Sequence, residues 1–507
     1  MKLTAADSSC QIGRVRRELR RLGSVLSLLA ALGLAGCAVG PNYQQPPPPD
    51  VKGYTSTPLA TTPTTPNIAG GEAQHFTEGL DLSGQWWELF HSKPLNALIE
   101  RSLSNNPTIK AAQAALTVAR ETTLAQKGAY WPAITGSFSA QRQKSAGELS
   151  PTPNSGALYF NLYTPQVSVS YVPDVFGLNR RTVESLFAQQ EQARFALVAT
   201  HLTLSANVAA AAVQEASLRG QIAATRDMIV INTNMLQILR NQFARGYVSR
   251  LDVAAQEAQL AQVAASLPPL LKQLAQQRDL LAALAGSFPT QDPAEQFELA
   301  TLQLPGELPV SLPAPLVAQR PDVRQAEAAL HAASAQIGIA VANRLPNVTL
   351  SADAGAMALE AGKMFADGST VWGLAGTVTQ PIFLGGTLLH RERAARAAYV
   401  EALAQYRGTV LTAFQNVADT LHAIEQDAEA LQAAAAARDA AKVTLDLARQ
   451  QWQSGYASYL ALLSAEQAYQ QAVMTLVQAQ ANRYADTVAL FQALGGGWWH
   501  RAELTKN

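Results

Sequence analysis

The sequence has little of what enzymes and metal proteins commonly use. Only two cysteines occur among its 507 residues, Cys10 and Cys37, and both lie near the N-terminus. A disulfide scaffold and a multi-cysteine metal site are therefore excluded. The seven histidines are scattered singly, and we expect them at the surface. No zinc-binding helix motif, nucleophile elbow or phosphate-binding loop is present. We therefore expect no enzymatic activity, no cofactor and no metal.

An excess of charge of one sign is also lacking, since the chain holds 38 basic and 38 acidic residues. Six basic and two acidic residues fall within residues 1–36, so the remainder carries 32 basic and 36 acidic residues. A nucleic-acid-binding protein would show a basic stripe, so no nucleic-acid partner is expected. After the N-terminus no apolar run reaches the roughly 20 residues that a spanning helix needs. Any membrane crossing would then use strands.

The N-terminus does contain a secretion signal. Arg14–Arg21 form a basic region, Val25–Gly33 form an apolar stretch too short to span a bilayer, and Leu34-Ala35-Gly36-Cys37 follows. We predict residues 1–36 as a lipoprotein signal peptide and Cys37 as the lipidation site. The alternative is a plain signal peptide with a chance cysteine. Ala38 rather than Asp follows Cys37, which favours sorting to the outer membrane.

The rest of the chain repeats itself. Asn106–Leu116 matches Arg320–Leu330 at an offset of 214, and Gln242–Ser249 matches Gln451–Ser458 at an offset of 209. Two halves of the chain therefore follow one plan. We predict four segments after the signal peptide: a lipid anchor and Pro/Thr-rich tether at 37–80, a first structural repeat at 81–300, a second at 301–499, and a C-terminal tail at 500–507.

Each repeat contains a long stretch that favours helix. Gly177 to Gly246 and Gly386 to Gly455 each span 69 positions without proline. A continuous helix of that length would extend about 100 Å. We predict long helical hairpins over 178–286 and 387–494. A seven-residue apolar repeat in the second hairpin indicates left-handed packing against neighbouring helices; it comprises Val410, Phe414, Val417, Leu421, Ile424, Ala428 and Leu431. The helices alone favour an ordinary antiparallel coiled coil.

Alternating segments at about 131–143, 159–172, 346–358 and 370–382 change that interpretation. Their apolar and polar faces are typical of a transmembrane barrel, although strands of a soluble sandwich also alternate. Four strands cannot close a barrel, and open edges in lipid leave unpaired backbone groups. Three copies would supply twelve strands. We therefore predict a mixed α/β membrane protein, internally duplicated, with a trimeric 12-stranded outer-membrane β-barrel continued by a long α-helical periplasmic barrel of coiled-coil helices.

Six further stretches carry a family resemblance. They are Cys37–Tyr43, Trp86–Phe90, Pro94–Ile99, Arg320–Glu327, Leu345–Leu350 and Ala493–Trp498. With these the sequence resembles outer-membrane efflux channels of the TolC/OprM type, closest to the NodT-family lipoproteins. The resemblance covers nearly all of 37–499.

The resemblance implies a homotrimer that exports drugs or toxic small molecules passively. Its partners would be a periplasmic membrane-fusion adaptor, an inner-membrane transporter of the RND or a similar type, and outer-membrane lipid. The implied location is the outer membrane, lipid-anchored and membrane-spanning, with a large periplasmic extension. Two alternatives stay open: a duct for type I protein secretion, and a lipid-anchored coiled-coil periplasmic scaffold without a pore.

The resemblance also implies a functional periplasmic tip where both hairpins turn. The implied gate residues are Arg250, Asp252, Tyr459, Leu460 and Ser464, and the implied adaptor-docking residues are Gly246, Tyr247, Val248, Gly455, Tyr456 and Ala457. Asp252 matches an acidic residue that holds the closed tip in the family. Ala461 and Ser464 replace the family's acidic ring, so Leu460 points to a mainly hydrophobic gate. The alternative for Arg250 and Asp252 is an ordinary helix start, where the helix dipole favours an acidic residue.

Overall fold

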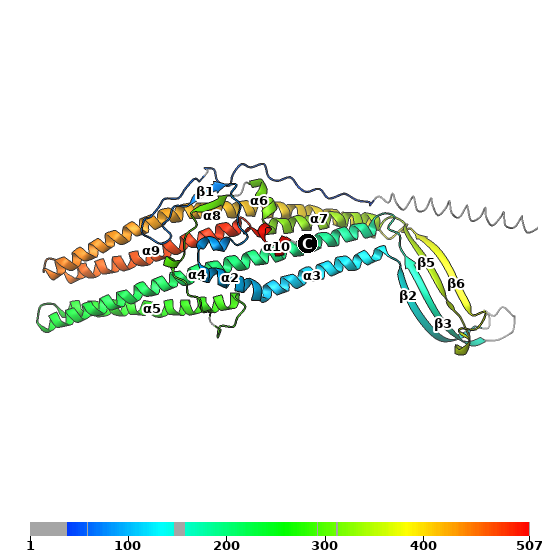
Figure 1. Cartoon of the computed structure of the whole chain (residues 1–507), viewed down its shortest axis with the longest axis horizontal. Helices are drawn as coiled ribbons and strands as arrows, with labels where there is room; N and C mark the ends of the chain where they lie inside the picture. Colours follow the sequence, from blue (N-terminus) through cyan, green and yellow to red (C-terminus); the bar gives the residue numbers. More distant parts are fainter. Residues whose placement is uncertain (1–37, 58, 147–157, 292, 311–312, 506–507) are drawn as a thin grey trace, which may run out of the picture. The chain divides into compact units, whose positions relative to one another are not determined.

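A computed structural model describes residues 38–57, 59–146, 158–291, 293–310 and 313–505 (Figure 1). The predicted signal peptide and Cys37 lie outside the described residues. The chain divides into two compact units, and each takes segments from both sequence repeats. The sheet unit comprises Thr117–Glu191, Ala328–Ala404 and the N-terminal residues through Gln45, and the hairpin unit comprises Pro46–Leu116, Gln192–Glu327 and Gln405–Asn507.

The sheet unit contains one antiparallel four-stranded sheet. Its strands are β2 (Ala133–Ser145), β3 (Leu158–Tyr171), β5 (Asn347–Ala356) and β6 (Thr370–Thr379), and their order is β2-β3-β5-β6. Figure 1 shows the two hairpins, β2–β3 and β5–β6, side by side in one curved sheet. Each repeat therefore supplies one hairpin, and β2 and β6 form the two edges of the sheet.

The register gives the sheet one apolar and one polar face. Ile134 pairs with Val169, Val169 with Ala352, and Ala352 with Leu374, so these four residues form one row across the sheet. Neighbouring rows carry serine, threonine and Asp353, whose Oδ1 accepts a hydrogen bond of 2.8 Å from Gln166 Nε2. Ile134 is 71% exposed and Leu374 is 75% exposed. The predicted alternation is confirmed, and the described residues of the sheet unit contain no second sheet that could cover the apolar face as in a sandwich.

Two pairs of helices of matched length dominate the rest of the chain. The long helices α4 (Leu178–Ala244) and α8 (Thr387–Gln453) have 67 residues each. The return helices α5 (Arg250–Leu284) and α9 (Tyr459–Ala493) have 35 residues each. Pro268 and Pro269 lie inside α5 without ending it. Two shorter helices, α3 (Pro107–Lys127) and α7 (Pro321–Ala342), precede β2 and β5 in equivalent positions.

One part of the long helix α4 is apolar enough to qualify the expectation that no segment after the N-terminus resembles a spanning helix. An 18-residue window of it has a mean hydropathy of 1.5, which by length and composition alone would suit a membrane span. Of that window 61% is buried inside the protein. A helix in the core of a folded unit meets the same test, so the window is consistent with core packing.

The apolar repeat of α8 packs as predicted. Val417 and Ile424 are fully buried, Phe414 is half-buried, and the other four members of the repeat are at most 6% exposed. The core of the hairpin unit gathers around η1 (Trp86–Phe90) and α2 (Lys93–Asn105). Trp86 lies 5.5 Å from Phe491 of α9 between ring centroids. The aromatic cluster therefore joins the segment before the first repeat's helices to the end of the second hairpin.

Equivalent residues of the two repeats close the return helices. Asn106 Nδ2 donates to the carbonyl of Leu284 at 2.9 Å, and Arg320 Nη1 donates to the carbonyl of Ala493 at 3.0 Å. The donors are 214 positions apart and the acceptors 209, the two offsets of the duplication. Each bond pairs a carbonyl that the end of a helix leaves without an intrahelical partner.

The remaining elements are short. β1 (His75–Glu78) pairs in parallel with β4 (Glu307–Val310). The others are α6 (Pro313–Gln319), α10 (Ala502–Thr505), η2 (Gly128–Tyr130), η4 (Leu299–Thr301), η5 (Ala361–Lys363) and η6 (Trp498–His500).

The expectation of surface histidines is wrong for two of them. His201 is half-buried, and burial together with Arg501 lowers its pKa to about 4. His331 stacks on Tyr43 with ring centroids 4.3 Å apart, and its Nε2 lies 3.0 Å from Glu184 Oε1. Both positions depend on contacts between segments distant in sequence, which single scattered histidines do not indicate.

Candidate functional site

The first hairpin turns at Gly246, whose φ of 76° lies in the left-handed region that glycine tolerates best. The amide of Tyr247 donates to the carbonyl of Gln242 at 2.9 Å and closes α4. Ser249 then caps α5, because its Oγ accepts from the amide of Asp252. Asp252 Oδ2 accepts in return from the amide of Ser249 at 3.0 Å and from its hydroxyl at 2.7 Å. These reciprocal bonds form a capping box.

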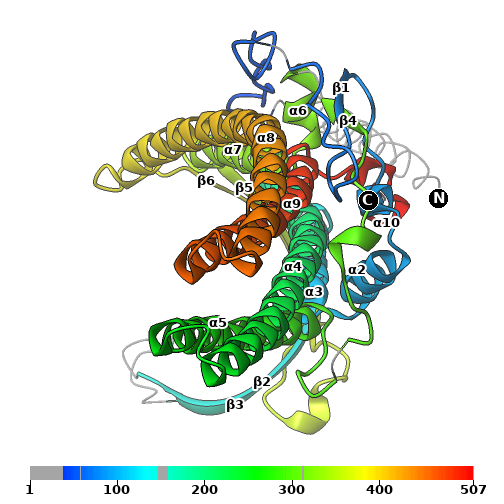
Figure 2. The same cartoon turned by 90° about the vertical axis from the view of Figure 1, so that its left-hand side faces the viewer.

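The second hairpin has the same turn with one difference. Gly455 has a φ of 78°, and the amide of Tyr456 donates to the carbonyl of Gln451 at 2.9 Å. Ser458 Oγ accepts from the amide of Ala461 at 3.3 Å. Ala461 occupies the position of Asp252 in the first hairpin, so the reciprocal half of the box is missing. Figure 2 shows the ends of both hairpins, α4–α5 and α8–α9.

Most of the predicted tip residues are exposed. The exposed fractions are 76% for Tyr247, 88% for Tyr456 and 67% for Leu460. Gly246, Gly455, Arg250 and Ser464 are exposed too, whereas Asp252 and Ala457 are half-buried. Val248 is half-buried against the apolar cluster described below. The two turns thus present aromatic and aliphatic side chains to their surroundings.

Tyr459 lies apart from the exposed set, because it is only 4% exposed. Its hydroxyl donates to Gln256 Oε1 of α5, and its ring packs edge-on against Trp452 at 6.1 Å. Burial raises the pKa of the Tyr459 hydroxyl. Around it lies the tip cluster, an apolar group drawn from all four hairpin helices: Met235, Leu236, Leu239, Val253, Leu445, Leu462, Leu463 and Ala465. Tyr459 of the second hairpin therefore contacts the first hairpin through both a hydrogen bond and apolar packing.

Gln256 completes this connection. Its Nε2 donates to the backbone carbonyl of Asn232 at 2.8 Å and to Asn232 Oδ1 at 3.0 Å. Asn232 lies on α4, Gln256 on α5 and Tyr459 on α9, so three of the four helices share one buried polar chain. A buried polar group is costly when unpaired, so these bonds also fix the register of the helices.

In each hairpin one ion pair links the long helix to the return helix, and neither pair was predicted from the sequence. Arg240 Nη2 lies 2.8 Å from Glu257 Oε1, and Arg449 Nη2 lies 3.9 Å from Glu466 Oε1. Both partners of the second pair follow those of the first by 209 positions. The offset between the repeats could therefore have shown that the two pairs are equivalent. Glu466 is 3% exposed, and no hydrogen-bond donor of the described residues reaches either carboxylate oxygen. Burial raises the pKa of the Glu466 carboxyl, and Arg449 offsets part of that rise.

A glutamine-rich cleft lies between the return helices. It has a volume of about 320 Å³, and Gln467 Nε2 donates across it to Gln259 Oε1 at 2.7 Å. The remaining lining residues are Gln262, Val263, Ser266, Gln470, Gln471 and Met474. Uncharged amides therefore separate α5 from α9 beyond the tip cluster. Among the described residues no group of three or more histidine, cysteine or acidic side chains could hold a metal ion.

Comparisons with known proteins show which family the chain is similar to. Residues 98–287 and 312–496 match a family model described as outer membrane efflux protein. The toluene efflux pump outer membrane protein TtgC of Pseudomonas putida is 30% identical over 486 residues, which cover 94% of this chain and 96% of that protein.

Solved structures share the fold. The outer-membrane channel OprN matches with a TM-score of 0.81 and 26% identity, over 91% of this chain and all of that one. The outer membrane protein VceC from Vibrio cholerae matches with a TM-score of 0.77 and 28% identity, over 82% of this chain and all of that one.

Proposed function

Because this chain belongs to the outer membrane efflux protein family, we propose that it is the outer-membrane channel of a tripartite efflux pump. It exports small molecules passively, and its relative TtgC is named for toluene efflux. The observation that carries the proposal is the sheet with an exposed apolar face and a polar face, connected at one end to the long helices. Such a sheet suits a barrel wall with lipid on one side and water on the other.

The active assembly is a homotrimer. The strands β2 and β6 leave unpaired backbone groups at both edges of a four-stranded sheet. In a membrane each such group would cost several kcal/mol, so the edges need partners. Three chains joined edge to edge supply twelve strands, above the minimum of eight for bacterial barrels. The helical hairpins of the three chains form the periplasmic tube.

The hairpin turns dock a periplasmic adaptor, and through it an inner-membrane transporter of the RND or a similar type. Support comes from Tyr247 and Tyr456, which are large, exposed and equivalent in the two repeats. Tyrosine provides much contact area at low entropic cost, which makes it frequent in interfaces. The other docking residues are Gly246, Val248, Gly455 and Ala457.

The gate lies at the same tip. Leu460 is exposed, and it forms an apolar constriction when three copies converge. Asp252 holds the closed state by a bond to a neighbouring hairpin, in addition to its cap on Ser249. Arg250, Ser464 and the buried Tyr459 complete the gate set. Ala461 and Ser464 supply no acidic ring.

The N-terminal residues direct the protein to the membrane and anchor it there. Residues 1–36 are removed as a signal peptide, Cys37 carries the lipid, and residues 37–80 tether it to the first repeat. The repeats span 81–300 and 301–499, and the tail spans 500–507. Of the two alternatives, a pore-free scaffold is disfavoured because it would expose the apolar face of the sheet to water. Protein secretion is disfavoured because TtgC is named for toluene efflux.

The decisive experiment is the mass of the mature protein in mild detergent, measured by light scattering with the detergent contribution subtracted. We expect a trimer, and we expect the trimer to conduct ions in a planar bilayer. A monomer or a dimer would leave four or eight strands and would overturn the channel assignment. A trimer that conducts no ions, even with the gate widened by Asp252→Ala, would favour the scaffold.

A further inference from the structure

The apolar face of the sheet ends in two basic residues at the hairpin end of β2. Side chains alternate between faces along a strand, so Ile134, Phe138, Arg142 and Lys144 share one face. Arg142 and Lys144 are exposed. Lys144 Nζ lies 5.3 Å from the ring centroid of Tyr159, its partner on β3. No ion pair joins either residue to another described residue.

The position of these residues along the strand places them at one membrane surface. The helix α3 and η2 precede β2, so the start of β2 is its periplasmic end and Ser145 is its outer end. Arg142 and Lys144 follow Ile134 by eight and ten residues. At about 3.3 Å per residue and a tilt of about 40°, they lie roughly 20–25 Å above Ile134 across the membrane. The apolar band of an outer-membrane barrel is about 25 Å tall, so both residues reach the outer headgroup region.

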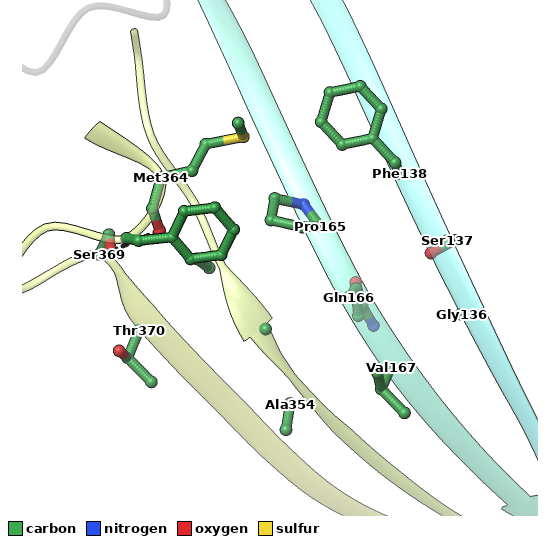
Figure 3. Close-up of a pocket in the computed structure, with 13 residues that line it drawn as sticks. Gly136, Ser137, Phe138, Pro165, Gln166, Val167, Ala354, Met364, Ser369 and Thr370 are labelled. Atoms are coloured by element: carbon green, nitrogen blue, oxygen red, sulfur yellow. Dashed lines mark hydrogen bonds between the residues drawn. The ribbon is translucent and has the colours of Figure 1, made fainter. Parts of the chain in front are cut away.

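An apolar cleft lies beside them on the same sheet. It has a volume of about 680 Å³, within the range of roughly 300–1,000 Å³ that is usual for ligand sites. Phe138, Pro165 and Val167 line it from β2 and β3, and Met364 and Phe365 line it from the β5–β6 connection. Figure 3 shows Met364 and Phe138 on opposite sides of Pro165. Phe138 precedes Arg142 by four residues, so the cleft lies below the basic pair.

We propose that this face binds an anionic lipid of the outer leaflet. The phosphate of the lipid head group contacts Arg142 and Lys144, and an acyl chain occupies the cleft between Phe138 and Phe365. Guanidinium and ammonium groups are the usual protein donors to phosphate. An acyl chain can reach the cleft directly from the surrounding lipid, because Phe138 is 63% exposed and Phe365 is 90% exposed. The inference requires the outer-membrane location only, so its failure would leave the efflux proposal intact.

The residue between the basic pair provides a matched control. Gln143 lies on the opposite face and pairs with Phe160 of β3. The double variant R142Q/Q143R keeps the net charge and moves one positive charge from the lipid face to the polar face. A specific site and a general attraction by net charge therefore give different results.

The test uses the full-length trimer in detergent, titrated with bisphosphorylated lipid A and followed by native mass spectrometry. We expect Arg142→Gln with Lys144→Gln to weaken binding about 30-fold, and R142Q/Q143R to weaken it about 5-fold, on the basis of the usual attraction of single basic residues for anionic lipid. Phosphatidylcholine, which carries no net charge, should bind equally to the wild-type protein and to the variants of Arg142, Gln143 and Lys144. Phe365→Ser should weaken lipid A binding without changing the fraction of trimer.

Three outcomes would overturn the proposal. Unchanged affinity in the double glutamine variant would show that the basic pair makes no contact with the phosphate. Unchanged affinity in R142Q/Q143R would show that only net charge matters. Full competition by inorganic phosphate at millimolar concentration would show a site for free anions. If the double glutamine variant loses the trimer, Lys144→Gln alone replaces it, with an expected loss of about 5-fold.

Discussion

Asp252 combines a local role with a proposed role in the assembly. Its carboxylate caps α5 through Ser249, and we propose that it also bonds to a neighbouring hairpin in the closed trimer. We expect Asp252→Ala to raise single-channel conductance in planar bilayers, because the variant loses the closing contact.

A second variant separates the two roles of Asp252. Ser249→Ala removes the cap at a cost of about 1 kcal/mol but keeps the carboxylate. It should lower the melting temperature and leave the conductance unchanged. If both variants raise conductance equally, loosening of the helix start would explain the effect, and Asp252 would have no separate part in closure.

Glu466 gives the tip a dependence on pH. Burial raises the pKa of its carboxyl above the ordinary value of 4.5, so the folded protein holds this proton more tightly than the unfolded chain. The resulting stabilisation is present at low pH and declines as the pH rises above about 4.5. We expect Glu466→Gln to remove this decline and to raise the melting temperature at pH 8, as measured by thermal unfolding.

Glu257, at the equivalent position of the first repeat, is the control. Its hydrogen bond with Arg240 lowers the pKa of the carboxyl, so the sign is reversed. Glu257→Gln should lose a little stability at neutral pH and none at low pH, as measured by thermal unfolding between pH 4 and 8. Equal pH profiles for the two variants would contradict an effect of burial at Glu466.

At the scale of elements, the strands provide the sharpest test of the barrel. Leu350→Arg puts a charge on the apolar face, where the cost reaches about 2–4 kcal/mol at the membrane midplane. Ser351→Arg places the same charge on the polar face one residue later. We expect Leu350→Arg to reduce the heat-stable oligomer recovered from membranes, and Ser351→Arg to leave it unchanged. Equal recovery of both would exclude lipid contact at this face.

The elements were predictable because local signals determine them. Proline-free stretches bounded by Gly246 and Gly455 indicated two long hairpins, and strict alternation indicated the strands. The buried side of α8 followed from its seven-residue repeat. Each of these features depends on residues close together in the sequence.

The contacts between hairpins were less predictable. Tyr459 lies in the first turn of α9, where its neighbour Leu460 is exposed, and its burial depends on contacts with Trp452 and with Gln256 of the other hairpin. Burial of Glu466 but not Glu257 likewise depends on how the helices pack. An offset between two repeats shows that these residues are equivalent, but it carries no information about their surroundings.

At the scale of the whole molecule, the N-terminal segment is held by protein contacts beyond the proposed lipid. Arg181 is 3% exposed, and its guanidinium donates to the carbonyl of Val39 at 3.0 Å and to Asn42 Oδ1 at 2.8 Å. Gly40 passes so close to Gly338 that a Cβ at position 40 would lie 2.5 Å from the Gly338 Cα. The residues that follow Cys37 therefore pack at a defined position against α4 and α7.

Acylation can then be tested without loss of the fold. We expect Cys37→Ser to abolish incorporation of labelled palmitate and to reduce recovery in the outer-membrane fraction. Cys10→Ser should retain both, because Cys10 lies within the proposed signal peptide. Palmitate labelling that survives Cys37→Ser would refute the lipidation site.

The two hairpins of each chain have helices of equal length, and this equality affects the symmetry of any complex that forms at the tip. A trimer of such chains presents six turns in two alternating kinds, three with Asp252 and three with Ala461. A ring of identical partner molecules that met all six turns would therefore face two different chemical environments. The assembly would look sixfold at the backbone but remain threefold at the side chains, so one partner surface would have to tolerate both.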